Sequence, residues 1–247
     1  MLLSIDALTE RDIAKTIDHS LLRPELDDQF VEDGCRLAAE YDVASVCVRP
    51  ADVTRAVAIL DGTGVAVGTV IGFPHGSHLT ATKVFEACQA LADGATELDM
   101  VIQIGALKSG RDGEVQADIA AIVEVAHAAG AIVKVIFENA YLTDDEKIRA
   151  CRLSEAAGAD FVKTSTGFAP GGATHDDLRL MRANTSPHIQ VKAAGGVRTL
   201  DALLEVLALG TTRIGATATN AIIDDFRARK AGRTPVTATP EATEGGY

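Results

Sequence analysis

The chain has 247 residues, of which 47% are hydrophobic and 23% are charged, and its formal net charge is −12. That length suits a single α/β barrel, which typically needs about 250 residues. The negative charge argues against nucleic acid or an anionic membrane as a partner, because like charges repel. For the same reason, an anionic substrate needs a local basic pocket.

The cysteines and histidines form no pattern that indicates disulfide bonds or a metal site. The four cysteines lie far apart without a Cys-x-x-Cys pair, and the N-terminal segment lacks the pattern of a signal peptide. No apolar run approaches the about 18 residues that cross a membrane. The histidines show no metal-ligand spacing, and we expect neither a metal nor another cofactor. The simplest interpretation is a reduced, cytoplasmic protein.

Short segments of β-branched residues alternate with longer segments rich in Ala, Leu and Glu along most of the chain. This alternation is typical of βαβ units with a parallel sheet. Strands are predicted at residues 15–18, 44–48, 65–72, 97–102, 132–138, 160–163, 189–192 and 212–215. Helices are predicted between them, among others at residues 80–92, 114–129, 143–157 and 199–208.

Eight strands with interleaved helices predict a closed (β/α)8 TIM barrel, preceded by an N-terminal helix, rather than an open sheet. No Gly-x-Gly-x-x-Gly motif follows the first strand, which disfavours a dinucleotide-binding sheet. We predict one barrel domain over residues 1–232. Residues 233–247 are rich in Pro, Thr, Ala and Glu and are predicted to form a flexible C-terminal tail.

The strongest functional signal is a lysine at the end of each of two consecutive strands. Lys163 stands in FVKTSTG and Lys192 in IQVKAAGG, each just before a loop of small residues. TIM-barrel sites lie at this end of the strands, and neighbouring strands are about 4.8 Å apart. At about 6 Å, two ammonium groups repel by on the order of 3 kcal/mol, which lowers the pKa of one by about two units. Attack on a carbonyl requires such a partly neutral amine.

The alternative is that both amines simply form ion pairs with carboxylates. For a single lysine at a strand end, an ion pair is the preferred interpretation. Two lysines on consecutive strands favour a role in a functional site. Asp99, inside the apolar segment ELDMVIQ, is a candidate proton relay or lysine partner, and both interpretations place it in the site. Glu138 is either a site residue or a charge at a helix start. Lys134 is interpreted as a buried ion-pair partner, with Asp99 or Glu138 as its acid.

Glycine-rich loops stand at the ends of the last three predicted strands. AAGGVRT (193–199) follows the seventh strand, and RIGATATN (213–220) covers the end of the eighth. Loops at these two places commonly bind phosphate in TIM barrels, because small residues let backbone N–H groups approach the oxygens. GFAPGGAT (167–174), after the sixth strand, extends this predicted anion site.

At this point the sequence resembles the class I deoxyribose-phosphate aldolases, in order and over nearly the whole chain to about residue 217. The resemblance implies reversible cleavage of 2-deoxy-D-ribose 5-phosphate to D-glyceraldehyde 3-phosphate and acetaldehyde, in deoxynucleoside breakdown, by a homodimer. The matching segments are IDHSLL (17–22), SVCVRP (45–50), VIGFPHG (70–76), ATKVFEA (81–87), ELDMVIQIGALKSG (97–110), KVIFENAYLT (134–143), FVKTSTGF (161–168), KAAGGVRT (192–199) and RIGAT (213–217).

Carried over by position, Lys163 resembles the Schiff-base lysine, Lys192 the second lysine that lowers its pKa, and Asp99 the acid that takes part in proton transfer. Tyr247 resembles a C-terminal tyrosine that reaches the site in some members, and a tail tyrosine without a role is the equal alternative. The resemblance also implies substrate contacts for Ser20, Cys47, Gly167, Gly195, Gly196, Arg198, Gly215 and Thr217.

One departure concerns the predicted phosphate site. This chain has Thr217 and Ala218 where many members of the family have serines. The loss of a hydroxyl donor predicts weaker phosphate binding and a preference shifted toward unphosphorylated aldehydes. Two other functions stay open: another Schiff-base phospho-sugar aldolase or transaldolase-like barrel, and a sugar-phosphate-binding protein without catalysis.

Overall fold

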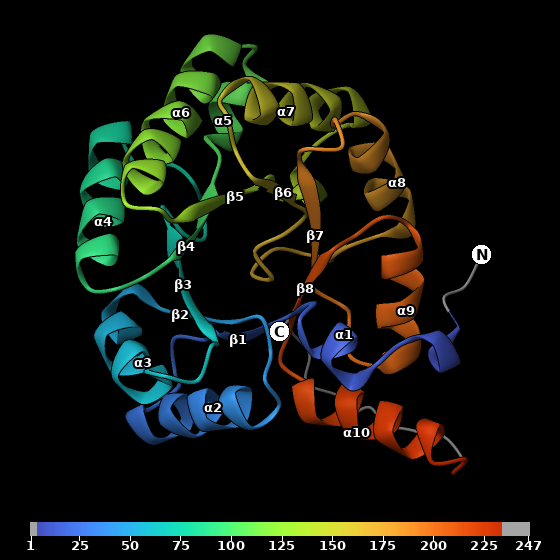
Figure 1. The fold of residues 1–247 in the computed structure, drawn as a ribbon. Helices are drawn as coiled ribbons and strands as arrows, with labels where there is room; N and C mark the ends of the chain where they lie inside the picture. The colour runs from blue at the N-terminus through green and yellow to red at the C-terminus, as the bar shows by residue number, and fades with distance from the viewer. Residues whose placement is uncertain (1–3, 234–247) are drawn as a thin grey trace.

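In the computed structural model, which describes residues 4–233, eight parallel strands close into a barrel inside a ring of helices (Figure 1). Each strand pairs with its neighbours in sequence, and β8 pairs with β1, which confirms the predicted (β/α)8 barrel. The strands are β1 (Ile17–Leu21), β2 (Ser45–Val48), β3 (Ala66–Ile71), β4 (Glu97–Val101), β5 (Ile132–Ile136), β6 (Phe161–Lys163), β7 (Gln190–Ala194) and β8 (Arg213–Ala216).

The helices of the described residues cover the outside of the barrel (Figure 1). The predicted N-terminal helix corresponds to α1, which packs with α10 next to the closing strands. The helices are α1 (Glu10–Ala14), α2 (Asp28–Glu40), α3 (Val53–Leu60), α4 (Thr80–Ala92), α5 (Ile104–Lys108), α6 (Asp112–Ala128), α7 (Asp144–Ala156), α8 (His175–Ala183), α9 (Leu200–Ala208) and α10 (Thr219–Lys230), with short 3-10 helices η1 (Ile5–Ala7), η2 (Pro50–Asp52) and η3 (Asn139–Tyr141).

Threonine caps set the starts of several helices. The predicted helices 143–157 and 199–208 begin one residue too early, because Thr143 and Thr199 are N-caps rather than helical residues. Their side chains accept hydrogen bonds from the backbone N–H groups of Glu146 and Ala202, which would otherwise lack partners. Helix α4 has the predicted bounds.

The first predicted strand, 15–18, is wrong by two residues or more at each end, since β1 spans Ile17–Leu21. Lys15 instead caps the C-terminus of α1, with its backbone N–H bonded to the carbonyl of Arg11. The fifth predicted strand, 132–138, also runs too long. Strand β5 ends at Ile136, and Glu138 has a left-handed backbone with a φ of 57°.

The hydrophobic core lies between the barrel and the helices, whereas the barrel interior is strongly charged. Buried residues such as Val46, Leu98 and Leu203 fill the outer layer. The interior of a TIM barrel is usually packed with Val, Ile and Leu. Here, charged side chains meet inside the barrel. Six of them are buried, Asp18, Glu97, Asp99, Lys134, Lys163 and Lys192, and Arg213 is partly buried.

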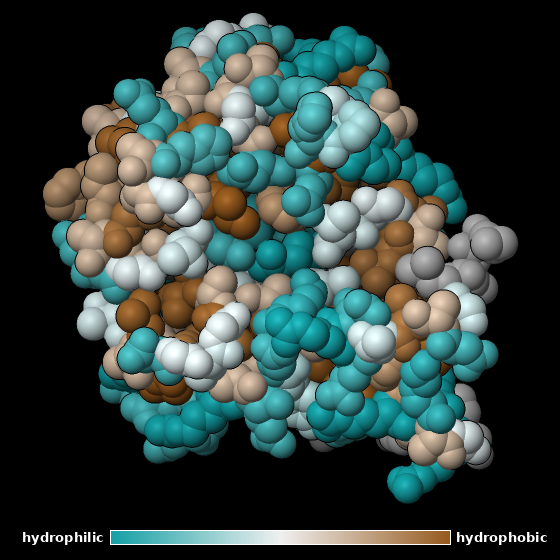
Figure 2. Space-filling view, viewed as in Figure 1, coloured by the Kyte–Doolittle hydropathy of each residue, from teal (hydrophilic) through white to brown (hydrophobic). Residues whose placement is uncertain are grey.

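In the view along the barrel, hydrophilic side chains occupy the middle of the face, and brown and tan side chains lie over α4 at its left edge (Figure 2). Within residues 4–233, no helix is long and apolar enough to cross a membrane. The predicted flexible tail, 233–247, lies outside the described residues except for its first residue, and Tyr247 lies outside them as well.

Candidate active site

The carboxylate of Asp99 brings three lysines together inside the barrel. Its Oδ2 accepts hydrogen bonds from Lys163 Nζ at 2.7 Å and from Lys192 Nζ at 2.8 Å. Its Oδ1 accepts one from Lys134 Nζ at 2.8 Å. Lys163 and Lys192 are register partners on β6 and β7, so parallel pairing places them side by side. The structure thus brings Lys163, Lys192, Lys134 and Asp99 together. The sequence predicted direct repulsion between the amines of Lys163 and Lys192, and in the structure both contact the carboxylate of Asp99.

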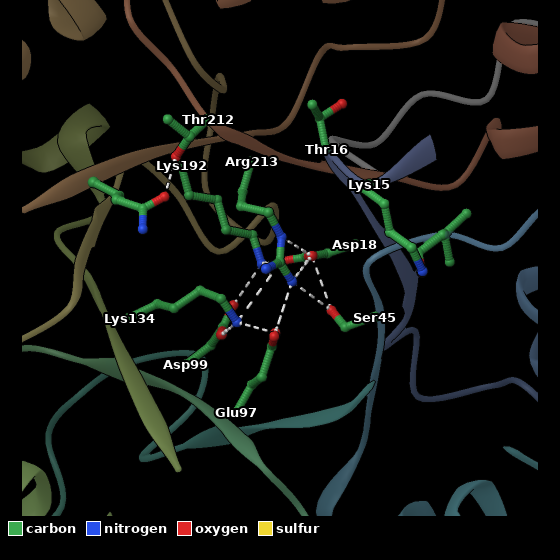
Figure 3. Close-up of polar contacts among 12 residues, drawn as sticks. Lys15, Thr16, Asp18, Ser45, Glu97, Asp99, Lys134, Lys192, Thr212 and Arg213 are labelled. Atoms are coloured by element: carbon green, nitrogen blue, oxygen red, sulfur yellow. Dashed lines mark hydrogen bonds and ion pairs between the residues drawn. The ribbon is translucent and has the colours of Figure 1, made fainter. Parts of the chain in front are cut away.

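A second set of ion pairs continues this network toward β1 and β8 (Figure 3). Asp18 Oδ2 lies 2.5 Å from Lys192 Nζ, and Asp18 Oδ1 accepts a hydrogen bond from Arg213 Nε at 2.6 Å. Glu97 Oε2 lies 2.8 Å from Arg213 Nη2 and 2.6 Å from Lys134 Nζ. Lys134 is therefore paired with Asp99, as one predicted alternative had it, and with Glu97, while Asp18 Oδ2 lies 3.7 Å away. Glu138, the other predicted alternative, is not among its partners.

The charges of this network favour the ionised forms of Asp99, Asp18 and Lys134. Burial favours the neutral form of Asp99, but Lys134, Lys163 and Lys192 outweigh it and hold the pKa of that carboxyl well below its usual range. Burial is also outweighed at Asp18, whose pKa Lys192, Lys134 and Arg213 lower. Burial opposes the ammonium form of Lys134, yet Asp99, Glu97 and Asp18 raise its pKa above the ordinary value.

Ser20, Cys47 and Gly215 border this network at the ends of β1, β2 and β8. A Cβ at Gly215 would lie 3.6 Å from Ser20 Oγ and 3.8 Å from Lys192 Cε, so these residues share one space. Cys47 packs with Leu22 in a small apolar cluster. Burial raises the pKa of the Cys47 thiol to about 11, with the charge of Asp99 acting in the same direction. The thiol is therefore protonated near pH 7.

A small cavity of about 300 Å³ lies among the glycine loops that follow β6 and β7. Gly195, Gly196 and Arg198 line it together with Gly171 and Gly172. The two loops touch so closely that a Cβ on Gly172 would lie 2.6 Å from the carbonyl oxygen of Gly195. A concave surface of backbone beside an arginine suits an anion.

Gly167, predicted for the anion site, does not line this cavity. It turns the β6–α8 loop with a φ of 89°, and the loop reaches the cavity only at Gly171 and Gly172.

A larger cavity of about 840 Å³ adjoins the anion cavity, since Arg198 lines both. Ser20 and Thr217 also line it, so it reaches the end of the barrel interior. His19 lines the same cavity, and its Nδ1 lies 2.8 Å from the hydroxyl of Thr219 at the start of α10. Burial lowers the pKa of His19 to about 4, which keeps the imidazole neutral near pH 7.

Glu138 lies outside the lysine network. Its Oε2 accepts a hydrogen bond from the backbone N–H of Thr166 at 3.1 Å and another from the Thr166 hydroxyl. Glu138 is the N-cap residue of η3, so it stands at a helix start, as one of the two alternatives had it, but its side chain makes no capping hydrogen bond there. The contact fastens the loop that leads away from Lys163.

Sequence reasoning missed four residues of the site: Asp18, Glu97, His19 and Arg213. Glu97 and Asp99 are two positions apart on one strand, and that spacing places both side chains on the same face. This signal was available in the sequence. The partners of Asp18 and Arg213 depend on the pairing of β1 with β8, which are nearly 200 residues apart along the chain.

Known aldolases are similar to this chain over most of its length. The family model described as DeoC/LacD family aldolase matches residues 13–223. A deoxyribose-phosphate aldolase of Rhodopirellula baltica is 52% identical over 216 residues, which cover 87% of this chain and 90% of the relative. One of Lysinibacillus sphaericus is 50% identical over 215 residues, covering 87% and 96%. The solved structure of a deoxyribose phosphate aldolase from Aeropyrum pernix, described as tetrameric, has a TM-score of 0.84 at 30% identity and covers 91% of this chain and 95% of that one.

Proposed function

Because the chain belongs to the DeoC/LacD aldolase family, we propose that it is a deoxyribose-phosphate aldolase whose Schiff base forms on Lys163. The reaction is the reversible cleavage of 2-deoxy-D-ribose 5-phosphate to D-glyceraldehyde 3-phosphate and acetaldehyde. The observation that carries the proposal is the contact of Lys163 and Lys192 with one carboxylate oxygen of Asp99 inside the barrel. Two amines held there, at the ends of β6 and β7, match the requirement of a class I aldolase for a nucleophile and a proton donor.

The balance of charge supports Lys163 as the amine that reacts. The interior network is electrically neutral when one of its lysines gives up a proton, because it holds four cationic side chains and three carboxylates: Lys134, Lys163, Lys192 and Arg213 against Asp18, Glu97 and Asp99. Lys192 contacts Asp99 and Asp18, whereas Lys163 contacts only Asp99 among the acids of the described residues. Lys163 is therefore the lysine of this network with the fewest carboxylate contacts, which supports it as the nucleophile.

The reaction then follows from these positions. Lys163 Nζ attacks C1 of the open-chain sugar, and the carbonyl oxygen leaves as water, which gives an iminium ion. The C3 hydroxyl loses its proton through water, and the C3–O bond becomes a carbonyl as the C2–C3 bond breaks. D-glyceraldehyde 3-phosphate leaves, and the electron pair of the broken bond moves to the iminium, which leaves an enamine of C1 and C2 on Lys163. Lys192 and Asp99 return a proton to C2, and hydrolysis releases acetaldehyde.

The anion cavity takes the phosphate in this proposal. Gly195 and Gly196 line this cavity with their backbone, and Arg198 lines it with a positively charged side chain. The cavity adjoins the larger one that Ser20 and Thr217 line. The positive charge of Arg198 attracts the phosphate locally, although the net charge of −12 on the whole chain repels anions. Ser20, Cys47, Gly215 and Thr217 border the path from the phosphate to Lys163 Nζ.

We further propose that the protein acts in the cytoplasm, in the breakdown of deoxynucleosides, and that it forms a homodimer. The cytoplasmic location rests on the four unpaired cysteines. The homodimer rests on the resemblance to the class I deoxyribose-phosphate aldolases. The similar enzyme from Aeropyrum pernix is described as a tetramer.

Turnover tests the function. We expect the purified chain to cleave 2-deoxyribose 5-phosphate with no added metal and with a chelator present, and we expect Lys163→Ala to abolish this activity. Lys108→Ala, which removes an exposed lysine on α5, serves as the matched control. An inactive wild-type protein would contradict the proposed reaction, and an active Lys163→Ala variant would contradict the choice of nucleophile.

A further inference from the structure

Glu138, at the end of β5, has a backbone conformation that a glycine would adopt more easily. Its φ of 57° lies in the left-handed region, where a side chain costs about 1 kcal/mol. Among the described residues other than glycine, only Asp42 shares a positive φ. The side chain of Glu138 is nevertheless buried, with 2% exposed. A residue held against its backbone preference indicates that the surrounding structure fixes it there, which often occurs at functional sites.

The left-handed residue shifts the pairing between β5 and β6 by one position. Within the two strands, each step along β5 matches one step along β6. Beyond them, the N–H of Phe137 bonds to the carbonyl of Lys163. The N–H of Asn139 then bonds to the carbonyl of Thr164, so two steps along one chain face a single step along the other. Glu138 is the extra residue, as in a β-bulge, and such a residue redirects its side chain.

The carboxylate of Glu138 is directed at Thr166, three positions after Lys163. Its Oε2 accepts hydrogen bonds from the backbone N–H of Thr166 at 3.1 Å and from the Thr166 hydroxyl. Among the described residues, Oε1 has no hydrogen-bond partner, so the contact with Thr166 orients the carboxylate. The hydroxyl oxygen of Thr166 accepts a hydrogen bond from the N–H of Phe168 at 3.0 Å. Hydrogen bonds therefore lead from the end of β5 into the β6–α8 loop.

The β6–α8 loop is also attached at its other end. The N–H of Ala173 bonds to the carbonyl of Gly195 on the neighbouring loop at 3.1 Å. Gly171 and Gly172, directly before Ala173, line the anion cavity. Residues 167–172 thus lie between two attachments, of which the first is the carboxylate contact. Because the cavity wall belongs to this segment, its position depends on both.

We propose that Glu138 is a positioning residue for the phosphate of the substrate. It holds the start of the β6–α8 loop through Thr166 and thereby keeps Gly171 and Gly172 at the anion cavity. The inference deepens the proposed function and rests on it. Without this attachment the loop has more conformations, and phosphate binding has to supply the free energy that orders it. Lys163 stays paired between β5 and β7, so the chemical step is little affected.

The test compares Glu138→Gly with Glu138→Gln. Glycine fits the left-handed backbone and removes the attachment, whereas glutamine keeps an oxygen that can accept hydrogen bonds from Thr166. We expect Glu138→Gly to raise KM for 2-deoxyribose 5-phosphate by about 10-fold or more and to lower kcat by less than about 3-fold. Its kinetics with unphosphorylated 2-deoxyribose should equal those of the wild type. We expect Glu138→Gln to keep KM within about 3-fold of the wild-type value.

Glu146→Ala is the matched control. Glu146 also binds a threonine, since its Oε2 accepts a hydrogen bond from the backbone N–H of Thr143 at 2.8 Å, but this contact caps the start of α7. We expect this variant to keep the wild-type KM for both sugars. The unfolding temperature of each variant shows that the kinetics are measured on folded protein.

Calorimetric titration with inorganic phosphate gives a readout that does not need turnover. We expect Glu138→Gly to raise the Kd of phosphate by about 10-fold or more, and Glu138→Gln to keep it within about 3-fold. A wild-type protein that is inactive but shows this pattern would contradict the proposed reaction and support the role of Glu138. That role would be overturned by an unchanged Kd in Glu138→Gly, by equal losses in the glycine and glutamine variants, by equal losses with both sugars, or by a wild-type protein that binds no phosphate.

Discussion

At the scale of single residues, Asp99 carries the largest share of the site. Its two carboxylate oxygens form ion pairs with three lysines, and the side chain is fully buried. Removing a buried carboxylate from among ammonium groups leaves their charges uncompensated, which destabilises the fold. The same carboxylate contacts both strand-end lysines of the proposed reaction. Stability and catalysis are therefore coupled at this residue, and a substitution has to be measured for both.

We expect Asp99→Asn to lower kcat by about 100-fold or more and to reduce the free energy of unfolding by about 3–5 kcal/mol. The amide has the shape of the carboxylate but cannot compensate the charges of Lys163, Lys192 and Lys134. Steady-state kinetics and urea unfolding measure the two effects on the same preparation. A variant with wild-type kcat would contradict the role of Asp99 in proton transfer.

Asp118→Asn separates the two effects. Asp118 is as buried as Asp99 and pairs with Lys83, but it lies between α4 and α6 outside the barrel. We expect this control to lose a similar amount of stability and to keep kcat at temperatures where it is folded. An equal loss of kcat in both variants would mean that the effect at Asp99 is only structural.

His19 makes the stability of the protein depend on pH in a window above the lowered pKa values of Asp18 and Asp99. Its folded-state pKa, about 4, lies below the ordinary value of 6.5, because burial disfavours the charged ring. The unfolded chain therefore binds a proton that the folded chain does not, and stability falls as the pH drops from about 6.5 to 4. The loss is on the order of 3 kcal/mol at most.

We expect His19→Gln to flatten this part of the curve of unfolding free energy against pH. Glutamine keeps a hydrogen-bonding group near the hydroxyl of Thr219 but does not titrate. Urea unfolding at several pH values between 7 and about 4 measures the slope. The same slope in the variant and the wild type would show that another group titrates in this window.

Some of these residues could be predicted from the sequence and some could not. Lys163, Lys192 and Asp99 stood out because a charged residue inside or at the end of an apolar strand is rare. Their placement together agrees with the prediction, and their chemical roles stay predictions. Asp18 and Arg213 could not be paired from the sequence, because their contact requires the closure of the barrel between β1 and β8.

At the scale of elements, the approach of the β6–α8 loop to the β7–α9 loop forms the anion cavity. A methyl group on Gly172 would collide with the backbone carbonyl of Gly195 at 2.6 Å, and backbone cannot turn aside as a side chain can. We expect Gly172→Ala to raise KM for 2-deoxyribose 5-phosphate by about 10-fold or more, with a smaller effect on kcat. Steady-state kinetics with 2-deoxyribose 5-phosphate measures both KM and kcat.

Two controls belong to this experiment. Gly113→Ala places a methyl group on α6 where no atom lies within 4 Å, and we expect its KM to equal that of the wild type. Unphosphorylated 2-deoxyribose has no group for the cavity, so Gly172→Ala is expected to leave its kinetics nearly unchanged. A uniform loss with both sugars would place the damage at the barrel interior rather than at the anion cavity.

The strands and helices themselves follow from the sequence to within a few residues, and the errors have local causes. The predicted strand at residues 15–18 begins too early because Lys15 is the C-cap residue of α1. The alternation of residue types does not reveal such a cap. The fifth strand was extended to Glu138, where a left-handed backbone breaks it. Tertiary contacts hold that conformation, since the Glu138 carboxylate binds Thr166 on the next loop.

At the scale of the whole molecule, the alternation of strands and helices was sufficient to predict the barrel, because eight such units have few ways to bury their apolar faces. The exposed apolar side chains were not predictable in the same way. Phe85 and Leu79 are ordinary helix and loop residues in sequence, and only the fold shows that their side chains are exposed.

The predicted division of the chain at residue 232 can be tested by truncation. Strand pairing of β8 with β1 and the packing of α1 on α10 close the barrel within the described residues. We therefore expect a chain of residues 1–232 to unfold at the same temperature as the full chain, within about 2 °C. Differential scanning calorimetry measures the comparison, and a clearly lower unfolding temperature would contradict the predicted domain boundary.

The most direct test of the central claim is to trap the covalent intermediate on the full-length protein. Borohydride added during turnover of 2-deoxyribose 5-phosphate reduces an iminium to a stable secondary amine, which peptide mass spectrometry assigns to one lysine. The account predicts an adduct on Lys163 that is absent in Lys163→Ala and absent without substrate. An adduct on Lys192 or Lys134, or no adduct on a protein that turns over its substrate, would contradict it.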